Sequence, residues 1–593
     1  MSTHADRVAA LRAELARDGL DGFLVPIADE HGSEYVPAYA RRLAWLTGFD
    51  GSAGAAVVLP GQAALFVDGR YTLQASRQVD ADLFTIVPQA ETPLPDWLAT
   101  QVAPGQRIGF DPWLYTERQV EALGCAVEGR GATLVAVAAN PLDRAWADQP
   151  VASPAPLVVQ SDALAGRTSA DKRADIARWL DSRGLDAVAI TMLDSIAWLF
   201  NIRGADVAHT PVPLAFAIVR RDGTATLFVD DIKLTPGVRA HLGNSVGTRP
   251  RWAFPDALAA LAGQAVAVDP DRSAHAVFAA LRAAGARVVA ARDPCVLPKA
   301  IKTPAEIAGM RQAHLRDGVA LTRFLHWLAV EAPGGCVDEL KAIARLEQFR
   351  RETGALEDLS FDTIAGSGPN GAIIHYRATE VTNRRVRPGE LFLIDSGGQY
   401  ADGTTDVTRT VSVGEPTADM RRHFTLVLKA HIALATAVFP DGARGCQLDG
   451  IARAPLWAAG LDYAHGTGHG VGAFLAVHEG PARIASYGGG DEPLRAGMIL
   501  SNEPGYYREG AFGIRIENLV LVVPRDLAGA EQPMLGFETL TLAPIDRALV
   551  DPSLLAPGER DWLNAYHAVV LAALGPQVGD AVRGWLAQAC APV

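Results

Sequence analysis

The sequence predicts a protein of the α/β (α+β) class, in which two similar α/β domains precede a larger domain of helices around a strongly bent sheet. Its 593 residues are too many for one hydrophobic core, and such a length indicates roughly two to four domains. A series of helix, strand and apolar segments near the N-terminus recurs in the same order about 155–165 residues later. After residue 300 a strong helix-start signal marks a third domain.

The two copies of the repeat share a helix, a strand and three short motifs. The first copy has an amphipathic helix pattern over residues 6–18 and a strand over residues 22–25. The second has a helix over residues 172–182 and a strand that ends at Thr191. In both, Gly-Leu-Asp precedes the strand, Trp-Leu follows it and Leu-Phe-Val-Asp comes last. A chance coincidence is the alternative, and three matches in one order disfavour it.

Proline-rich segments and a helix-start signal set the expected domain boundaries. Residues 140–156 contain four prolines and show little periodicity, and residues 294–298 begin and end with a proline. The sequence Thr303-Pro304-Ala305-Glu306 has the N-cap, first-turn proline and third-position acid of a helix that continues toward Val330. We therefore expect domains at residues 1–150, 151–300 and 301–545. Residues 546–593 should form a helical pair that either caps the third domain or contacts a second subunit.

Composition and charge exclude several classes of protein. The net charge of −13 argues against nucleic-acid or anionic-membrane binding, because both need basic surfaces. No apolar run approaches the ~20 residues of a membrane span, and the first twenty residues lack the apolar core of a signal peptide. The five cysteines show no CxxC pair and are expected to be reduced. We expect a cytoplasmic protein.

Five residues able to bind hard cations stand in fixed settings between residues 391 and 518. They are Asp395 in LFLID, Asp406 in DVTRT, His469 in HGTGHGVG, Glu503 in ILSNEPG and Glu517 in GIRIENLVLVV. Four carboxylates and one imidazole do not suit a single structural zinc, which prefers Cys and His. They suit two divalent cations bridged by carboxylates, with manganese favoured and cobalt, iron or zinc acceptable.

The neighbours of these residues strengthen the metal interpretation. An aspartate in a glycine-rich turn is usually a turn residue, but the turn between Asp395 and Asp406 would fold two antiparallel strands together and bring both carboxylates to one place. Four close carboxylates raise one another's pKa values, and two divalent cations would cancel their charge. No phosphate-binding GxxxxGK[ST] occurs, so we assign His469 as a ligand and His465 to the substrate side.

Three other polar residues have both a functional and an ordinary interpretation. Strand alternation puts Arg515 and Glu517 on the same face of the strand, where Arg515 would orient the carboxylate of Glu517. A surface ion pair is the alternative, and the apolar character of the strand disfavours it. His375 in NGAIIHYR and His478 in AVHEGP would, taken alone, more often be structural histidines.

Taken together, six motifs resemble a known family. IIHYR, LFLIDSGGQYADGTTDVTRT, HGTGHGVG, VHEGP, SNEPGYY and GIRIENLVLV occur in order across residues 373–522. In this they resemble the pita-bread metallopeptidases and, among them, the Xaa-Pro aminopeptidases (aminopeptidase P). WLTGFDGSAG, FVDGRYT, KTPAEI and DWLNAYH extend the resemblance to the long, three-domain cytosolic form.

The resemblance implies a fold and a set of site residues. Residues 1–150 and 151–300 would be creatinase-like α/β domains, residues 301–545 a pita-bread catalytic domain, and residues 546–593 a helical extension. Two metals, usually manganese, would be held by Asp395, Asp406, His469, Glu503 and Glu517. The substrate site would be lined by His375, His465 and His478, with Tyr507 contributing to a proline pocket.

The implied activity is hydrolysis of the bond between a peptide's N-terminal residue and a proline in second position. Glu503 would act as base, and His478 would stabilise the oxyanion. A prolidase, which cleaves only dipeptides, is the alternative, and the additional middle domain disfavours it. A creatinase-like hydrolase would lack these ligands, a non-enzymatic module would have lost them, and methionine aminopeptidases are shorter. A homodimer is expected, since twofold assemblies are the commonest.

Overall fold

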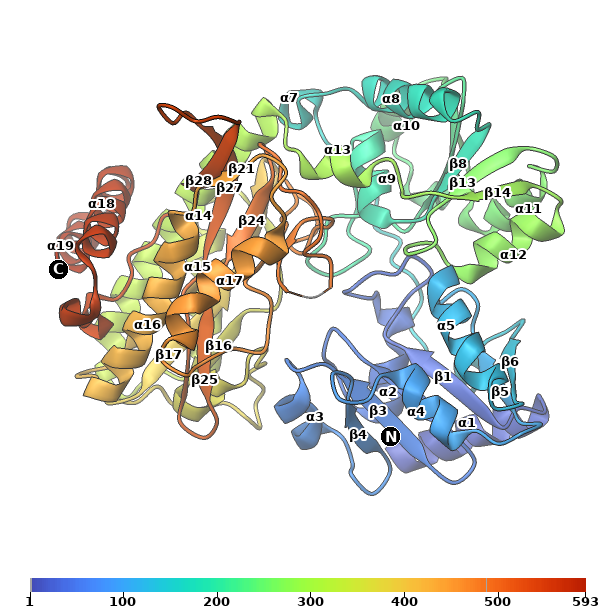
Figure 1. Ribbon diagram of the computed structural model, residues 1–593, viewed down its shortest axis with the longest axis horizontal. Coiled ribbons are helices and arrows are strands. Elements are labelled where there is room, and N and C mark those ends of the chain that lie inside the picture. The colour runs from blue at the N-terminus through green and yellow to red at the C-terminus, as the bar shows by residue number, and fades with distance from the viewer. Residues whose placement is uncertain (1–2, 487) are drawn as a thin grey trace. The chain divides into compact units, whose positions relative to one another are not determined.

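The structure is a computed structural model that describes residues 3–486 and 488–593. The chain divides into two compact units, one of residues 1–162 and 167–296 and the other of residues 163–166 and 297–593. Figure 1 shows the helices and strands of each unit. The N-terminal unit contains two α/β domains, and the C-terminal unit contains the predicted metal-binding residues.

The first domain is a six-stranded mixed sheet in the order β4-β3-β2-β1-β5-β6. The central strand pairs antiparallel with β2 and parallel with β5, and the outer pairs β3–β4 and β5–β6 are parallel. The strands are β1 (Gly22–Pro26), β2 (Ala55–Val58), β3 (Ala63–Val67), β4 (Thr85–Pro88), β5 (Arg107–Phe110) and β6 (Thr133–Ala136). The helices are α1 (His4–Arg17), α2 (Arg42–Thr47), α3 (Thr72–Gln78), α4 (Leu94–Gln101), α5 (Glu117–Glu128) and α6 (Pro141–Ala145).

Both faces of this sheet are buried, because successive side chains of a strand point to opposite sides. Phe23 of β1 packs in the core that contains Leu11 of α1. Leu24, the next residue, packs in a second core with Leu123 and Val127 of α5. This two-sided burial explains why the strand sequence GFLVP is apolar without alternation.

The second domain repeats the strand order and the strand directions of the first. Its sheet has the order β12-β11-β10-β8-β13-β14, with β8 antiparallel to β10 and parallel to β13. The strands are β8 (Ala187–Ile190), β10 (Phe216–Arg220), β11 (Ala225–Phe228), β12 (Val246–Arg249), β13 (Ala265–Val268) and β14 (Arg287–Ala290). The helices are α8 (Ser169–Ser182), α9 (Leu193–Phe200), α10 (Pro236–Leu242), α11 (Phe254–Ala259) and α12 (His275–Ala283). The predicted internal repeat is therefore confirmed.

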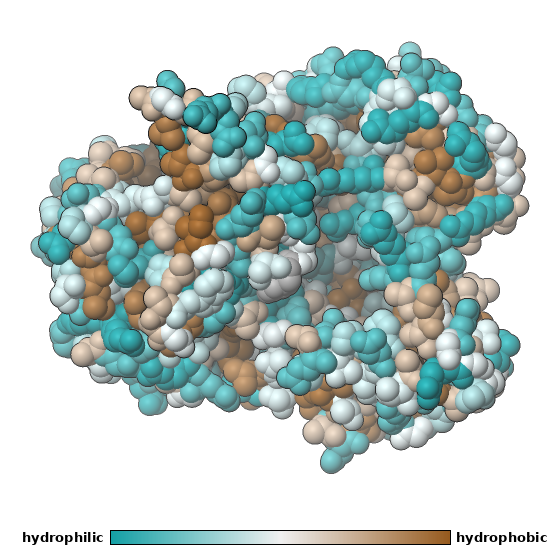
Figure 2. Space-filling model, in the orientation of Figure 1, coloured by the Kyte–Doolittle hydropathy of each residue, from teal (hydrophilic) through white to brown (hydrophobic). Residues whose placement is uncertain are grey.

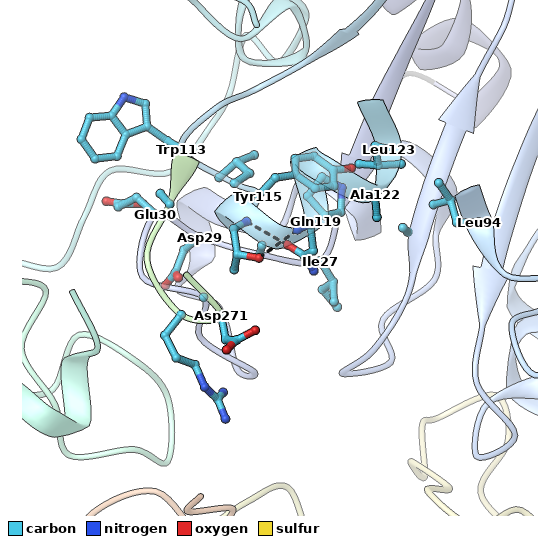
Figure 3. A pocket seen from close by; sticks show the side chains of 18 of the residues that line it. Ile27, Asp29, Glu30, Leu94, Trp113, Tyr115, Gln119, Ala122, Leu123 and Asp271 are labelled. Carbon is cyan, nitrogen blue, oxygen red and sulfur yellow. Dashed lines mark hydrogen bonds between the residues drawn. The ribbon is translucent and has the colours of Figure 1, made fainter. Parts of the chain in front are cut away.

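A cavity of about 430 Å³ lies in the N-terminal unit, where the first domain meets residues 271–274 of the second (Figure 3). Apolar residues such as Ile27 and Leu94 line it together with Trp113 and Tyr115. Nearby, the His275 ring lies 2.7 Å from the Glu117 carboxylate, which joins α12 to α5. None of the residues predicted to bind metal or substrate lines this cavity.

The C-terminal unit surrounds its strands with long helices (Figure 1). They are α14 (Pro304–Glu331), α15 (Glu339–Arg351), α16 (Ala418–Ala435), α17 (Gly445–Trp457), α18 (Pro557–Leu574) and α19 (Asp580–Ala589), and the short α13 (Val296–Ala300) precedes them in the chain. The capping box predicted for α14 is present, because the Thr303 side chain accepts from the Glu306 backbone and the Glu306 side chain accepts from the Thr303 backbone. The helical pair at the C-terminus also forms, and it shares a core with α16 and β26.

The strands of this unit form several small sheets rather than one continuous bent sheet. The main sheets have the orders β16-β17-β20 and β21-β28-β27-β24. Their strands are β16 (Ile364–Ser367), β17 (Leu391–Ser396), β20 (Val407–Ser412), β21 (Phe439–Pro440), β24 (Ile499–Asn502), β27 (Asn518–Arg525) and β28 (Met534–Thr539). Shorter strands complete the set: β15 (Leu356–Leu359), β18 (Gly398–Tyr400), β19 (Gly403–Thr404), β22 (Gly468–His469), β23 (Arg483–Ile484), β25 (Gly505–Arg508) and β26 (Phe512–Arg515).

On the face drawn in Figure 2, hydrophilic residues cover much of the surface and hydrophobic residues lie between them in small groups. All five cysteines are free. Over the part of the chain that the structure describes, no helix combines the length and apolar character needed to cross a bilayer.

A buried ion pair joins α14 to α15 and supports the scaffold of the C-terminal unit. The Arg350 guanidinium donates two hydrogen bonds, of 2.7 and 3.0 Å, to the Asp317 carboxylate. The Tyr400 hydroxyl donates a third to the same carboxylate at 2.7 Å. Burial by itself would raise the pKa of Asp317, but the attraction to Arg350 and the hydrogen bonds from Arg350 and Tyr400 together outweigh it and lower this pKa.

Replacing Arg350 by alanine should destabilise the protein by about 3–5 kcal/mol, because the Asp317 carboxylate would remain buried without its cation. The measurement is the urea midpoint followed by tryptophan fluorescence. Arg316→Ala is the matched control, since its bidentate pair with Asp402 is partly exposed and should contribute less than about 1 kcal/mol. Equal shifts for both variants would contradict the assignment.

Candidate metal centre

A β-hairpin brings Asp395 and Asp406 together. Asp395 is the penultimate residue of β17, and Asp406 directly precedes β20. The two strands pair antiparallel with Asp395 opposite Thr408. The glycine-rich connection must pass close to the returning chain, because a Cβ on Gly397 would lie 1.9 Å from the Thr405 carbonyl oxygen. The predicted fold-back of the two strands therefore occurs.

Glu517 reaches the same place because the expected strand is interrupted at this residue. The segment GIRIENLVLVV was expected to be one strand, but β26 ends at Arg515 and β27 begins at Asn518, so Glu517 stands between two sheets. The Thr408 hydroxyl donates to the Glu517 carboxylate at 2.7 Å and fixes its orientation. Ligand atoms of Asp406, His469 and Glu517 all lie within 4.8 Å of one another.

His469 and Glu503 are delivered by two segments that are joined through Ser501. The Ser501 hydroxyl donates to Glu503 Oε1 at 2.9 Å and accepts from the His469 backbone N–H at 3.0 Å. The close approach requires glycine before the histidine, since a Cβ on Gly468 would lie 2.0 Å from the Ser501 carbonyl oxygen. His469 Nε2 then lies 3.3 Å from Glu503 Oε1 and 3.5 Å from Asp406 Oδ2.

The tautomer of His469 follows from its other ring nitrogen. Nδ1 lies 3.1 Å from the Gly470 carbonyl oxygen, which only accepts, so Nδ1 carries the proton in the neutral ring. Nε2 then presents a lone pair toward the carboxylate oxygens of Asp406 and Glu503. Three electron-rich groups that face one another in this way attract a cation between them.

Like charges and burial perturb the pKa values of these carboxyl groups. Burial raises the pKa of Asp406 well above its usual value, and the carboxylates of Glu517, Asp395 and Glu503 raise it further. The same causes, burial first, raise the pKa of Glu517. Burial also raises the pKa of Glu503 to about 7, although Arg515 opposes the change. Such a cluster favours protonation or a bound cation.

Arg515 contacts Asp395 rather than Glu517. Its Nη2 donates to Asp395 Oδ2 at 2.5 Å, and its Nε donates to the Thr408 hydroxyl at 3.1 Å. The side chain is 1% exposed, so it does not form a surface ion pair. The expected contact with Glu517 assumed an unbroken strand. Asp395 Oδ1 is buried and has no hydrogen-bond partner among the described residues.

Tyr507 links Arg515 to His465. The Tyr507 hydroxyl accepts from Arg515 Nη1 at 2.7 Å and lies 2.9 Å from His465 Nε2. Burial raises the pKa of Tyr507 to about 12, so the phenol stays neutral and can also donate. His465 is itself held from behind, since Arg453 of α17 donates to its carbonyl oxygen at 2.6 Å.

The other two histidines of the motifs lie at the border of this cluster. The His478 ring stands edge-on to the His469 ring with 4.3 Å between centroids. His375 is partly exposed, and the preceding carbonyl, that of Ile374, accepts from Arg515 Nη1 at 3.4 Å. The structure thus brings the five expected ligands, Arg515, Tyr507 and the histidines 465 and 478 into one region, with His375 next to it.

Several supporting residues were missed from the sequence. Lys299 and Lys302, both nearly fully buried, form ion pairs with the carboxylate of Glu479, the residue after His478. Asp449 of α17 accepts from the Thr467 hydroxyl at 2.5 Å and from Arg453 at 2.8 Å. Motif context was the only signal in the sequence for the contacts of Glu479 and Thr467, which join different elements, whereas Asp449 and Arg453 have the i, i+4 spacing of a pair on one helix.

The chain matches four family descriptions along its length. Residues 7–140 and 148–306 each match a creatinase/prolidase N-terminal domain, residues 308–524 match metallopeptidase family M24, and residues 533–593 match the C-terminal region of the M24 peptidases. The expected fold of two creatinase-like α/β domains followed by a pita-bread catalytic domain is confirmed. The domain boundaries at 150, 300 and 545 stay predictions.

Known relatives extend over the whole chain. A probable Xaa-Pro aminopeptidase P of Paracoccidioides brasiliensis is 40% identical, with 99% of each chain covered. An X-prolyl aminopeptidase of Caenorhabditis elegans, described as a cytosolic enzyme with a di-nuclear active site, is 35% identical, with all of both chains covered and a TM-score of 0.95. A prolidase of Pyrococcus horikoshii shares the fold over 63% of this chain and 99% of its own, at 24% identity and a TM-score of 0.50. The chain therefore belongs to metallopeptidase family M24 and, within it, to the Xaa-Pro aminopeptidase (aminopeptidase P) family.

Proposed function

We propose that this protein is a metal-dependent aminopeptidase that hydrolyses the bond between the N-terminal residue and a proline in second position of a peptide. The observation that carries the proposal is the meeting of Asp406, His469 and Glu517 within 4.8 Å, in a chain that is similar to Xaa-Pro aminopeptidases along its full length. Proline lacks an N–H and has a fixed φ, so its bonds need a dedicated site.

The donor set fits two divalent cations. Asp395 Oδ1 is buried and has no hydrogen-bond partner among the described residues, and His469 Nε2 presents a lone pair. Burial and then the neighbouring carboxylates raise the pKa values of Asp406 and Glu517. We assign Asp395, Asp406, His469, Glu503 and Glu517 as ligands of two ions, with Mn²⁺ preferred and Co²⁺, Zn²⁺ or Fe²⁺ acceptable. When bound, two such ions would offset the charge and make a water molecule acidic enough to act as a nucleophile near neutral pH.

Glu503 is the residue that we assign as general base. Ser501 holds its carboxylate in place among the other proposed ligands, where it would be able to accept a proton from a water molecule. The carboxylate would take a proton from the attacking water and pass it to the prolyl nitrogen that leaves. Glu503 Oε1 lies 3.3 Å from His469 Nε2, so this carboxylate lies among the proposed ligands.

The histidines and Tyr507 are assigned to the substrate. His478, next to His469, would donate a hydrogen bond to the scissile carbonyl oxygen as negative charge develops there. His375 would bind a neighbouring carbonyl group. His465 and Tyr507, joined at 2.9 Å, would form the side of the proline pocket. The free amino group of the substrate would lie near Asp395, which limits cleavage to the first residue.

We also propose that the protein acts in the cytoplasm as a homodimer, without a membrane or nucleic-acid partner. Five free cysteines are typical of a reducing compartment, and the Caenorhabditis elegans relative is described as cytosolic. Twofold assemblies are the commonest among soluble oligomers.

The direct test of the proposed function compares three peptides after loading with Mn²⁺. An Xaa-Pro-Xaa tripeptide should release its first residue, and replacing the proline by alanine should lower kcat/KM by about 10-fold or more, because the pocket is shaped for the pyrrolidine ring. Amino-acid analysis of the products provides the measurement. The dipeptide Xaa-Pro is the decisive comparison, since a protein that cleaves the dipeptide and leaves the tripeptide intact is a prolidase.

Replacing a proposed ligand should abolish both metal binding and catalysis. Asp406→Ala and His469→Ala should each lower kcat by more than about 100-fold, because each removes a donor from the cluster. Bound metal, measured by elemental analysis, should fall in the same samples. His326→Gln, on α14 and outside the cluster, should keep normal values of both. Full activity in either ligand variant would refute the assignment of the site.

The metal-free protein should lose stability as the pH rises. An acid whose pKa is raised in the folded protein binds its proton more tightly there, and this stabilises the fold at low pH. For Glu503 the stabilisation is complete below pH 4.5, the ordinary pKa, and is lost as the pH rises through about 7. The loss is on the order of 3 kcal/mol for this group. Melting temperatures of chelated protein should therefore be lower at pH 8 than at pH 5.

Two controls accompany this pH series. Glu503→Gln in the chelated protein should make the profile less steep, because one of the titrating carboxyl groups is gone. Added Mn²⁺ should stabilise the unmodified protein more at pH 8 than at pH 5, since protons compete for the same oxygens. A metal-free protein that is equally stable at both pH values would contradict the charge argument.

A further inference from the structure

Arg409, on β20, is a buried cation that is held by uncharged groups. Its side chain is 1% exposed, and burial lowers the pKa of its guanidinium from the ordinary value. Its nitrogens donate to Pro544 O, Thr408 O, Glu517 O, Asn518 Oδ1, Ala543 O and the Tyr566 hydroxyl, at 2.7 to 3.0 Å. Because no acceptor carries a charge, this arginine depends on the number and geometry of its hydrogen bonds.

Two of these acceptors belong to the backbone that delivers the proposed ligands. Arg409 Nη1 donates to the carbonyl oxygens of Thr408, at 2.8 Å, and of Glu517, at 2.7 Å. The same two residues are joined by a backbone hydrogen bond of 3.2 Å and by the Thr408 hydroxyl on the Glu517 carboxylate. One guanidinium nitrogen therefore links β20, which directly follows Asp406, to Glu517 in the connection between β26 and β27.

The opposite side of the guanidinium is held by the C-terminal extension. The Tyr566 hydroxyl of α18 accepts from Arg409 Nη2 at 2.9 Å and lies within donating distance of Ala543 O, at 2.9 Å, and Thr541 O, at 3.0 Å. Its ring stacks on Trp562, one turn earlier, with centroids 5.4 Å apart and planes 5° apart. Among the residues that the structure describes, Tyr566 is the sole acceptor of Arg409 on α18 or α19. Helix α18 packs beside α14 and α16 (Figure 1).

We propose that the C-terminal helical extension is a positioning part of the metal centre and acts through Tyr566. Tyr566 fixes the Arg409 guanidinium, and Arg409 fixes the Thr408 and Glu517 carbonyls, which sets the separation of the Asp406 and Glu517 carboxylates that receive a divalent cation. Tyr566 touches neither metal nor substrate in this arrangement and is a positioning residue. The inference rests on the proposed function, since it requires those carboxylates to bind metal.

The first test replaces Tyr566 by phenylalanine in the full chain and measures the Mn²⁺ dissociation constant by competition with a metal indicator. The ring and its stacking on Trp562 remain, and Arg409 loses one acceptor. We expect about 10-fold weaker binding, in the range found for residues that orient metal ligands, and a lower kcat with KM unchanged. An unchanged dissociation constant would overturn the proposal.

His567→Phe is the matched control on the same helix. His567 accepts from the Ile545 backbone N–H at 3.1 Å and also joins the extension to the catalytic domain, but it makes no hydrogen bond to Arg409. This variant should lower the melting temperature as Tyr566→Phe does and leave the Mn²⁺ dissociation constant unaltered. If both variants weaken metal binding equally, the extension acts through general stability and the proposed path is wrong.

A double variant tests whether Tyr566 acts through Arg409. Arg409→Lys keeps the charge but cannot reach all six acceptors, so it should weaken Mn²⁺ binding at least as much as Tyr566→Phe. Because both changes interrupt one path, the double variant should bind no more weakly than Arg409→Lys by itself, whereas additive losses would show independent roles and refute the proposal. Should Tyr566→Phe fail to fold, normal Mn²⁺ binding by Arg409→Lys would refute it equally.

The same titration separates this inference from the proposed function. If the unmodified protein binds no Mn²⁺ and cleaves no Xaa-Pro-Xaa peptide, the proposed function fails, and the inference fails with it. If the unmodified protein does both and Tyr566→Phe matches it, the inference alone fails.

Discussion

The mutual repulsion of four carboxylates in one water-poor site is the constraint on which the rest of the C-terminal unit depends. Asp406 and Glu517 are almost fully buried, and their pKa values rise first because of that burial and further because each faces the other carboxylates. A fold that holds such a cluster must supply compensating charge and a rigid frame. Arg515 supplies part of the charge by pairing with Asp395, and the remainder matches a pair of divalent ions.

The frame is built from supports that each hold a ligand from behind. Thr408 orients Glu517, and Ser501 orients Glu503 and the backbone of His469. Arg453 of α17 holds the carbonyl of His465. Lys299 and Lys302 pin the Glu479 carboxylate next to His478. Because each support is a hydrogen bond or ion pair to a buried or partly buried group, small shifts in the scaffold would change the positions of the carboxylates.

The same logic gives the C-terminal extension a role in the site. A guanidinium with only neutral acceptors is costly to bury, and the two hydrogens of Arg409 Nη2 are shared among three of them, so removal of the Tyr566 hydroxyl leaves the guanidinium less firmly oriented. Tyr566 provides that acceptor from a helix that shares a hydrophobic core with Ile514 and Ile516, which flank Arg515 in the chain. The packing of the C-terminal extension is thereby linked to the positions of the proposed metal ligands. The N-terminal unit, in contrast, repeats one sheet topology twice and encloses a separate cavity.

The sequence by itself determined the features that depend on local chemistry. The start of α14 follows from the capping box at Thr303, and the repeat follows from the recurring order of a helix, a strand and three short motifs. The five candidate ligands follow from carboxylates and a histidine in their motifs. Tertiary structure decided the rest. It interrupts the strand at Glu517 and pairs Arg515 with Asp395. It also brings Tyr566 to Arg409, 157 residues away in the chain. Local patterns record the preferences of neighbouring residues, whereas these contacts arise only when distant segments pack and buried polar groups must find partners wherever the fold places them.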